Sequence, residues 1–178
     1  MMPHGLFGML IFVVAEIMFF AGMISAFVII KAGSAVWPPL DQPRLPVEET
    51  AVNTLALLAS GFFLILAHRA FHKGDRESMQ RPMWIALFLG AFFVLFQGAE
   101  WVVLLGQGLT LTSSSLGSFF YMIVGVHALH AVAALVLLGV AVMRLRQGWL
   151  TPGLFGAAET LWLFVVAVWP VLYLVVYL

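Results

Sequence analysis

The chain has 178 residues, of which 63% are hydrophobic and only 9% are charged. A soluble domain is usually about half apolar and about a quarter charged, so the composition excludes a water-soluble fold and makes lipid the solvent. The formal net charge of zero argues against a nucleic-acid partner, and the lack of cysteine excludes disulfides, thiolate metal ligands and cysteine nucleophiles.

Five segments are long and apolar enough to cross a bilayer. A spanning helix needs about 20 mostly apolar residues, because the hydrocarbon core is about 30 Å thick and each helical residue rises about 1.5 Å. We expect Pro82 in the first turn of the third helix, where its missing N–H costs nothing. The sequence therefore predicts an all-α membrane protein, a bundle of five transmembrane helices in one domain. The predicted spans are residues 5–30, 49–71, 82–105, 116–143 and 155–177.

The first span is expected to stay in the mature protein. A secretion signal has a basic n-region, a short apolar core and a cleavage site of small residues. Residues 1–7 contain no Lys or Arg, and the apolar run continues to Ile30. Between the spans, proline, glycine and charge predict loops at residues 31–48, 72–81, 106–115 and 144–153.

The distribution of Lys and Arg predicts the orientation. The first loop carries only Lys31 and Arg44. Six cations flank the second and fourth loops instead: Arg69, Lys73, Arg76, Arg81, Arg144 and Arg146. We therefore expect the N-terminus in the cytoplasm and the C-terminus on the outer, periplasmic side.

Glu16 is the clearest ionisable group inside a span. A carboxyl group at that depth must be neutral, paired or beside a wet cavity. His127 and His130 share one face of the fourth span at the same predicted depth, which predicts a Glu–His network between the first and fourth helices. Such a network either locks the two helices together or relays protons or binds a ligand, and a divalent metal is a further alternative. Axial haem ligands approach iron from opposite faces, so this histidine pair alone does not predict a haem site.

Two further polar residues, Gln97 and Glu100, share a face near the outer end of the third span. We expect them to pack on a neighbouring helix, and Glu159 in the fifth span has the same interpretation. Glycines inside the spans are expected to permit close helix approach. They are Gly61, Gly90, Gly98, Gly125 and Gly139.

His68 and His72 lie one helical turn apart at the inner end of the second span. This spacing can bind a metal, but the neighbouring Arg69 favours contact with anionic lipid headgroups. Arg144, at the inner end of the fourth span, has the same predicted role. No phosphate-binding loop or nucleophile motif is present, so no catalytic residue is predicted.

Four segments of the sequence carry recognisable motifs. Residues 97–101 form a Gln-x-x-Glu-aromatic element, and residues 120–130 form the motif Phe-Tyr-x-x-x-Gly-x-His-x-x-His. A Glu-bearing helix is expected at residues 10–22, and residues 37–46 with Asn53 and Thr54 form the next loop and helix start. Together these motifs resemble subunit III of the haem-copper oxidases (cytochrome c and quinol oxidases), and five spans instead of seven resemble the short bacterial form of that family.

The last span departs from the family pattern at two positions. The family usually has Trp-His-Phe-x-Asp there, whereas this chain has Leu163 in place of the His and Val166 in place of the Asp. Pro170 is also unusual at its position. If those polar groups normally join the Glu–His network, the network is smaller here.

The resemblance implies a non-catalytic subunit in a bacterial inner membrane. It implies no cofactor on this chain, with haem and copper held by subunits I and II, and phospholipid bound in a cleft. Subunit I would be the main partner, with subunit II and small subunits further away. Glu16, His127 and His130 would form the family's polar cluster beside that cleft, supporting sustained proton-coupled oxygen reduction. The alternatives are an accessory subunit of a nitric oxide reductase, a small transporter or channel using this cluster, and a haem-binding cytochrome.

Overall fold

The computed structural model describes residues 4–39 and 42–178; residues 1–3 and 40–41, which belong to the predicted N-terminal segment and first loop, lie outside the described residues. Five helices are long and apolar enough to cross a membrane, and the described residues form no β-strand. The predicted all-α fold with five spans is confirmed. The helices are α1 (His4–Gly33), α2 (Val47–His72), α3 (Arg76–Gly106), α4 (Ser115–Arg146) and α5 (Pro152–Leu172), which the π-helical turn η1 (Tyr173–Tyr177) continues.

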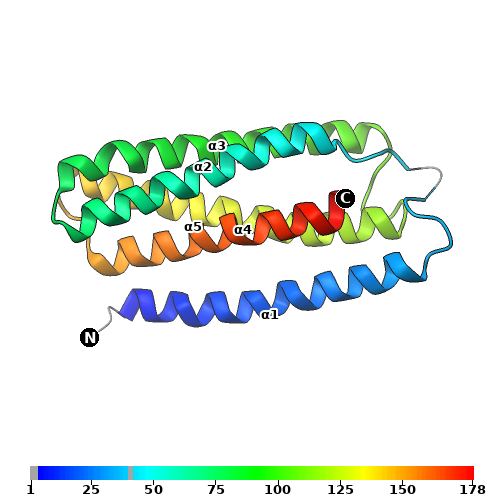
Figure 1. Ribbon diagram of the computed structural model, residues 1–178, viewed down its shortest axis with the longest axis horizontal. Helices are drawn as coiled ribbons and strands as arrows, with labels where there is room; N and C mark the ends of the chain where they lie inside the picture. The colour runs from blue at the N-terminus through cyan, green and yellow to red at the C-terminus, as the bar shows by residue number, and fades with distance from the viewer. Residues whose placement is uncertain (1–3, 40–41) are drawn as a thin grey trace.

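The helices run up and down beside one another, with α1 on one side, α4 and α5 between, and α2 and α3 on the other side (Figure 1). α5 contacts α1, α2 and α4, while α2 packs mainly on α3. α1 is the most exposed helix, because only Phe20 and Phe27 of its residues are buried. We call the end of the bundle where α1 begins the N-terminal end, and the end that carries the α1–α2 connection the loop end.

The helix ends are closed by local hydrogen bonds. α2, α3 and α4 are each followed by a glycine with positive φ, at Gly74, Gly108 and Gly148, a conformation that glycine adopts without the steric cost of a Cβ. The next N–H in each case reaches back to the last turn, as Asp75 N does to Ala70 O at 3.1 Å. These bonds satisfy carbonyl groups that the helix itself leaves unpaired.

The start of α3 corrects the predicted position of Pro82. The helix begins at Arg76, and its N-cap Asp75 accepts a hydrogen bond from Ser78 N at 2.9 Å. Pro82 therefore lies inside the helix and not in its first turn. The 31-residue helix is about 46 Å long, longer than the hydrocarbon core. The predicted loop of charged residues is thus largely a helical extension of the apolar span, because an apolar run indicates the membrane-crossing part of a helix and not its full length.

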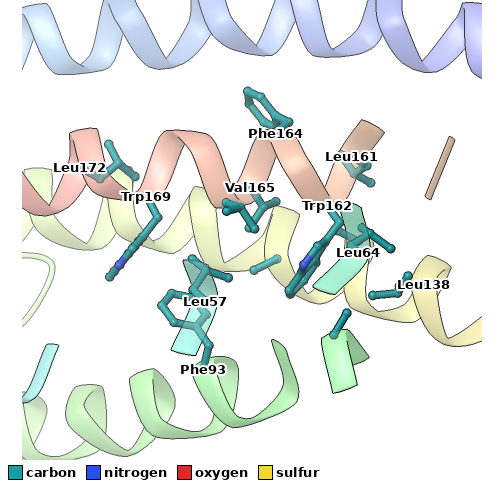
Figure 2. Packing of buried hydrophobic residues seen from close by; sticks show 14 of the residues in the cluster. Leu57, Leu64, Phe93, Leu138, Leu161, Trp162, Phe164, Val165, Trp169 and Leu172 are labelled. Atoms are coloured by element: carbon teal, nitrogen blue, oxygen red, sulfur yellow. The ribbon is translucent and has the colours of Figure 1, made fainter. Parts of the chain in front are cut away.

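Two tryptophans of α5 hold it against α2. Trp162 and Trp169 are fully buried and point away from α1, whereas Phe164 points toward α1 (Figure 2). Trp162 Nε1 donates to Ser60 Oγ at 2.9 Å, and Trp169 Nε1 donates to Thr54 Oγ1 at 2.8 Å. A buried indole N–H in lipid requires such a partner. The two hydrogen bonds, two helical turns apart, therefore fix the rotation of α5 on α2.

Close approach is confirmed at two of the glycines predicted to permit it. A Cβ at Gly90 would lie 2.5 Å from the Trp162 ring, and one at Gly61 would lie 2.9 Å from Val166 Cγ1. Both glycines therefore leave room for α5 side chains. The prediction is wrong at Gly98, whose Cβ would meet nothing within 4 Å. Ordinary van der Waals distances of 3.8 and 3.9 Å are found at Gly125 and Gly139.

Candidate functional site

Glu16 of α1 faces His130 of α4, and both side chains are ionisable. Glu16 Oε2 lies 3.2 Å from His130 Nε2, and the two side chains are only 18% and 12% exposed. Phe12 and Phe20, one turn before and after Glu16, lie with their ring centroids 6.0 and 5.6 Å from the imidazole. The structure therefore brings Glu16 of α1 and His130 of α4 into contact, with aromatic rings of α1 on the turns before and after Glu16.

The hydrogen bonding of His130 determines whether its Nε2 atom donates to Glu16 or accepts from it. His130 Nδ1 lies 2.8 Å from Val126 O, and because a carbonyl only accepts, Nδ1 carries a hydrogen. In neutral imidazole, Nε2 is then an acceptor that faces the Glu16 carboxyl group. Glu16 Oε2 has no aligned hydrogen bond among the described residues. One added proton, on either residue, makes the contact favourable and leaves the pair with no net charge.

His127 lies on the same face of α4 but has different surroundings. It is 1% exposed and stacks on Trp169, with the ring centroids 5.1 Å apart. Neither of its ring nitrogens has a hydrogen-bond partner among the described residues. The structure thus joins one of the two predicted histidines directly to Glu16. His127 is instead held between the rings of Trp169 and Phe20.

A second buried polar cluster lies nearer the loop end. Gln97 Nε2 donates to Glu100 Oε2 at 2.7 Å and to the Tyr177 hydroxyl at 3.1 Å. Thr50 Oγ1 lies 3.1 Å from both Glu100 carboxyl oxygens and 2.7 Å from Pro46 O, so three acceptor atoms surround its one hydrogen. Gln97 and Glu100 therefore pack on α2 and on η1, consistent with the expected packing on a neighbour.

Sequence reasoning did not identify Thr50 and Tyr177 as partners in this cluster. A signal for the α2 side was available, because Thr50, Asn53 and Thr54 recur at helical spacing in an otherwise apolar segment. All three are buried, and Asn53 Nδ2 donates to Phe93 O at 3.2 Å. Polar residues on one face of a membrane helix indicate the face that packs on other helices. Nothing in the sequence indicates that η1 turns Tyr177 toward α3.

The N-terminal end of the bundle contains a third ionisable contact. His68 Nδ1 lies 2.8 Å from Glu159 Oε2, with side chains 42% and 12% exposed, and the His68 and His72 ring centroids are 4.3 Å apart. His68, predicted as a lipid headgroup contact, is thus paired with α5. Arg69 and Arg144 are exposed at the same end. Within residues 4–39 and 42–178, no group of three or more His, Asp or Glu side chains is arranged to hold a metal ion.

The two departures in the last span have apolar surroundings. Val166 is buried and packs on Gly61 of α2. Leu163 is partly buried and packs against the hydrophobic core. Position 166 is therefore part of a close helix contact between an aliphatic side chain and a glycine.

Comparison of the amino-acid sequence with known proteins identifies the family of this chain. The family model described as "Cytochrome c oxidase subunit III" matches residues 2–178. The cytochrome c oxidase subunit 3 of Oryctolagus cuniculus is 33% identical over 180 residues, which cover 96% of this chain and 68% of the relative. The probable cytochrome c oxidase subunit 3 of Nocardia farcinica (strain IFM 10152) is 33% identical over 174 residues, covering 96% of this chain and 85% of the relative. The resemblance seen in the motifs is confirmed: the chain belongs to the cytochrome c oxidase subunit III family.

Proposed function

We propose that this chain is the non-catalytic third subunit of a respiratory haem-copper oxidase in a bacterial inner membrane. In this role it packs on catalytic subunit I, with subunit II and small subunits further away, and binds phospholipid. The observation that carries the proposal is the family match along residues 2–178. The partly buried carboxyl groups add support, because Glu16 and Glu159 each face a histidine of another helix.

The exposed surface of α1 supports a role as a docking surface for protein and lipid. Large apolar side chains lie on several faces of this helix, with Ile11, Phe12 and Ile17 exposed by 58%, 42% and 52%. A helix that is apolar all round is suited to burial in lipid or in a larger assembly. We assign the N-terminal end of the bundle to the cytoplasm because most Lys and Arg residues lie there, and we assign Arg69 and Arg144 to phospholipid headgroups.

The Glu16–His130 pair is proposed to support sustained turnover. A pair that gains one proton is neutral as a unit, so α1 remains docked on α4 without an isolated charge in lipid. A displaced α1 would expose the aromatic rings around His130, and we expect it to release lipid bound beside them. The cluster therefore acts on the lifetime of the working complex and not on its chemical step.

Mild solubilisation of the native membrane tests the proposed assembly. A tag on this chain is expected to co-purify a large haem-copper subunit, and the isolated chain is expected to show no haem absorption in its visible spectrum. Haem retained by the isolated chain would refute the proposal. Recovery with a nitric oxide reductase would select that alternative, and recovery of the chain alone, with transport activity in vesicles, would select the transporter.

Substitutions at Glu16 test the role of the pair. Glu16→Gln supplies an amide N–H that can donate to His130 Nε2, whereas Glu16→Ala supplies no donor. We expect both variants to start turnover at close to the wild-type rate, with Glu16→Ala losing activity faster during turnover and retaining less phospholipid. Equal lifetimes for Glu16→Ala and wild type would contradict the lifetime role. An immediate and complete loss of activity in the fully assembled Glu16→Ala complex would indicate an obligatory catalytic role instead.

A further inference from the structure

A cavity of about 300 Å³ at the N-terminal end of the bundle brings two histidines together with a carboxylate. His68 and His72 line it from the last two turns of α2, and Glu159 lines it from α5. Arg69 and Lys73, which follow the two histidines in the sequence, do not line it. The cavity therefore presents imidazole nitrogens and one acidic group without a cationic side chain, a lining that favours a bound cation over an anionic lipid headgroup.

The contact with Glu159 leaves the second nitrogen of His68 available to a ligand. His68 Nδ1 lies 2.8 Å from Glu159 Oε2. An ionised carboxyl group only accepts hydrogen bonds, so Nδ1 carries the hydrogen and Nε2 keeps its lone pair. In metal sites a carboxylate often holds the non-coordinating nitrogen of a histidine ligand in this way, which fixes the orientation of the ring and makes it a more basic ligand.

His72 places a second imidazole within reach of the same ion. It lies one helical turn after His68 on the same face of α2, and the two ring centroids are 4.3 Å apart. Two nitrogens that bind one tetrahedral Zn²⁺ at about 2.0–2.1 Å lie about 3.3 Å from each other. The His72 side chain is exposed, so its ring can turn to meet that distance while Glu159 holds the His68 ring.

The number and type of these ligands define the class of ion. No group of three or more His, Asp or Glu side chains in the described parts of the chain is arranged to hold a metal, so two nitrogens are the protein ligands and water completes the coordination shell. Imidazole suits Zn²⁺ and Cu²⁺, whereas Mg²⁺ and Ca²⁺ prefer oxygen ligands. We propose that His68 and His72 bind a divalent transition-metal ion, with Glu159 positioning His68. The site uses residues of this chain alone, so it does not depend on the proposed function.

Zinc binding to the full chain, purified in mild detergent with a tag that contains no histidine, tests the site. Competition with a chromophoric zinc chelator measures the stoichiometry and the affinity, and X-ray absorption at the zinc edge reports the ligands. We expect one Zn²⁺ per chain, with two imidazole nitrogens at about 2.0–2.1 Å, and no displacement by excess Mg²⁺. A chain that binds no Zn²⁺, a coordination shell with fewer than two imidazoles, or displacement by Mg²⁺ would overturn the proposal.

Variants assign the ion to its ligands. Glu159→Gln keeps an acceptor for His68 but loses the negative charge, and we expect it to weaken zinc binding by about 10-fold, as loss of a group that orients a ligand typically does. His68→Ala and His72→Ala each remove a ligand and are expected to weaken binding further. His72→Ala leaves the His68–Glu159 contact in place, so it provides the test if His68→Ala does not fold.

His4→Ala is the matched control, because His4 is exposed at the same end of the bundle and does not line the cavity. Its zinc affinity is expected to equal that of the wild type. An unchanged affinity in His72→Ala, or an equal loss of affinity in His4→Ala, would contradict the assignment.

Discussion

The contact between Gly90 of α3 and Trp162 of α5 allows a quantitative test of the packing. A Cβ at Gly90 would lie 2.5 Å from both Cζ2 and Cη2 of Trp162 and 2.9 Å from Leu135 Cδ1. Trp162 is fully buried and its indole is bonded to Ser60, so the ring cannot move away freely. Overpacking a core costs about 1–3 kcal/mol, and alanine recovers about 0.5–1 kcal/mol of helix propensity. Gly90→Ala is therefore expected to lower the free energy of unfolding by about 1–2 kcal/mol.

The assay is reversible unfolding in detergent micelles titrated with sodium dodecyl sulfate and followed by circular dichroism. Gly139→Ala is the matched control, because its Cβ would meet its nearest atom at 3.9 Å; this variant is expected to be as stable as wild type or up to about 1 kcal/mol more stable. In a Trp162→Phe background, which lacks the clashing ring atoms, the loss caused by Gly90→Ala should fall by at least half. The reasoning would be refuted if Gly90→Ala were as stable as Gly139→Ala.

Three further outcomes follow from individual hydrogen bonds. A double-mutant cycle of Thr54→Val and Trp169→Phe should give a coupling free energy of about 0.6–1.7 kcal/mol from their 2.8 Å hydrogen bond, and a coupling of zero would contradict the assigned contact. Glu159→Gln should lower the free energy of unfolding by less than about 1 kcal/mol, because His68 is partly exposed and the amide oxygen can still accept a hydrogen bond from it. A larger loss would contradict the small contribution expected for a partly exposed pair. The hydrogen bonds from Ser78 hold the pKa of Asp75 below its ordinary value of 3.8. This carboxylate therefore stabilises the fold at pH values above its unfolded-state pKa, and the stabilisation is lost as the pH falls through the lower folded-state pKa. Thermal unfolding measured as a function of pH should show this loss in wild type and not in Asp75→Asn.

The sequence was sufficient to predict the elements of the fold, because membrane crossing imposes a length and a composition on each helix. The Glu16 partner on α4 could also be anticipated, since a carboxyl group in lipid must be paired and few polar residues lie at its depth. His127 shows the limit of this reasoning. Its spacing from His130 indicates a shared face of α4, but not which ring meets Glu16 and which stacks on Trp169.

The contacts between helices could not be derived in the same way. The helices are apolar on most faces, so hydrophobic periodicity does not indicate how each is rotated about its axis. The bonds from Trp162 to Ser60 and from His68 to Glu159 depend on that rotation. The start of α3 was misplaced for a different reason, because Asp75 and the charged residues after it form a capped helix outside the apolar span.

The most direct test of a non-catalytic role is the time course of oxygen consumption by the purified oxidase complex with and without this chain. The account predicts equal initial rates per haem for the two preparations. It also predicts faster loss of activity during turnover without the chain, and recovery of the lifetime when the chain is added back in lipid. A complex that lacks the chain, retains its haem and copper in the partner subunits and yet has no initial activity would contradict the account, as would an unchanged lifetime.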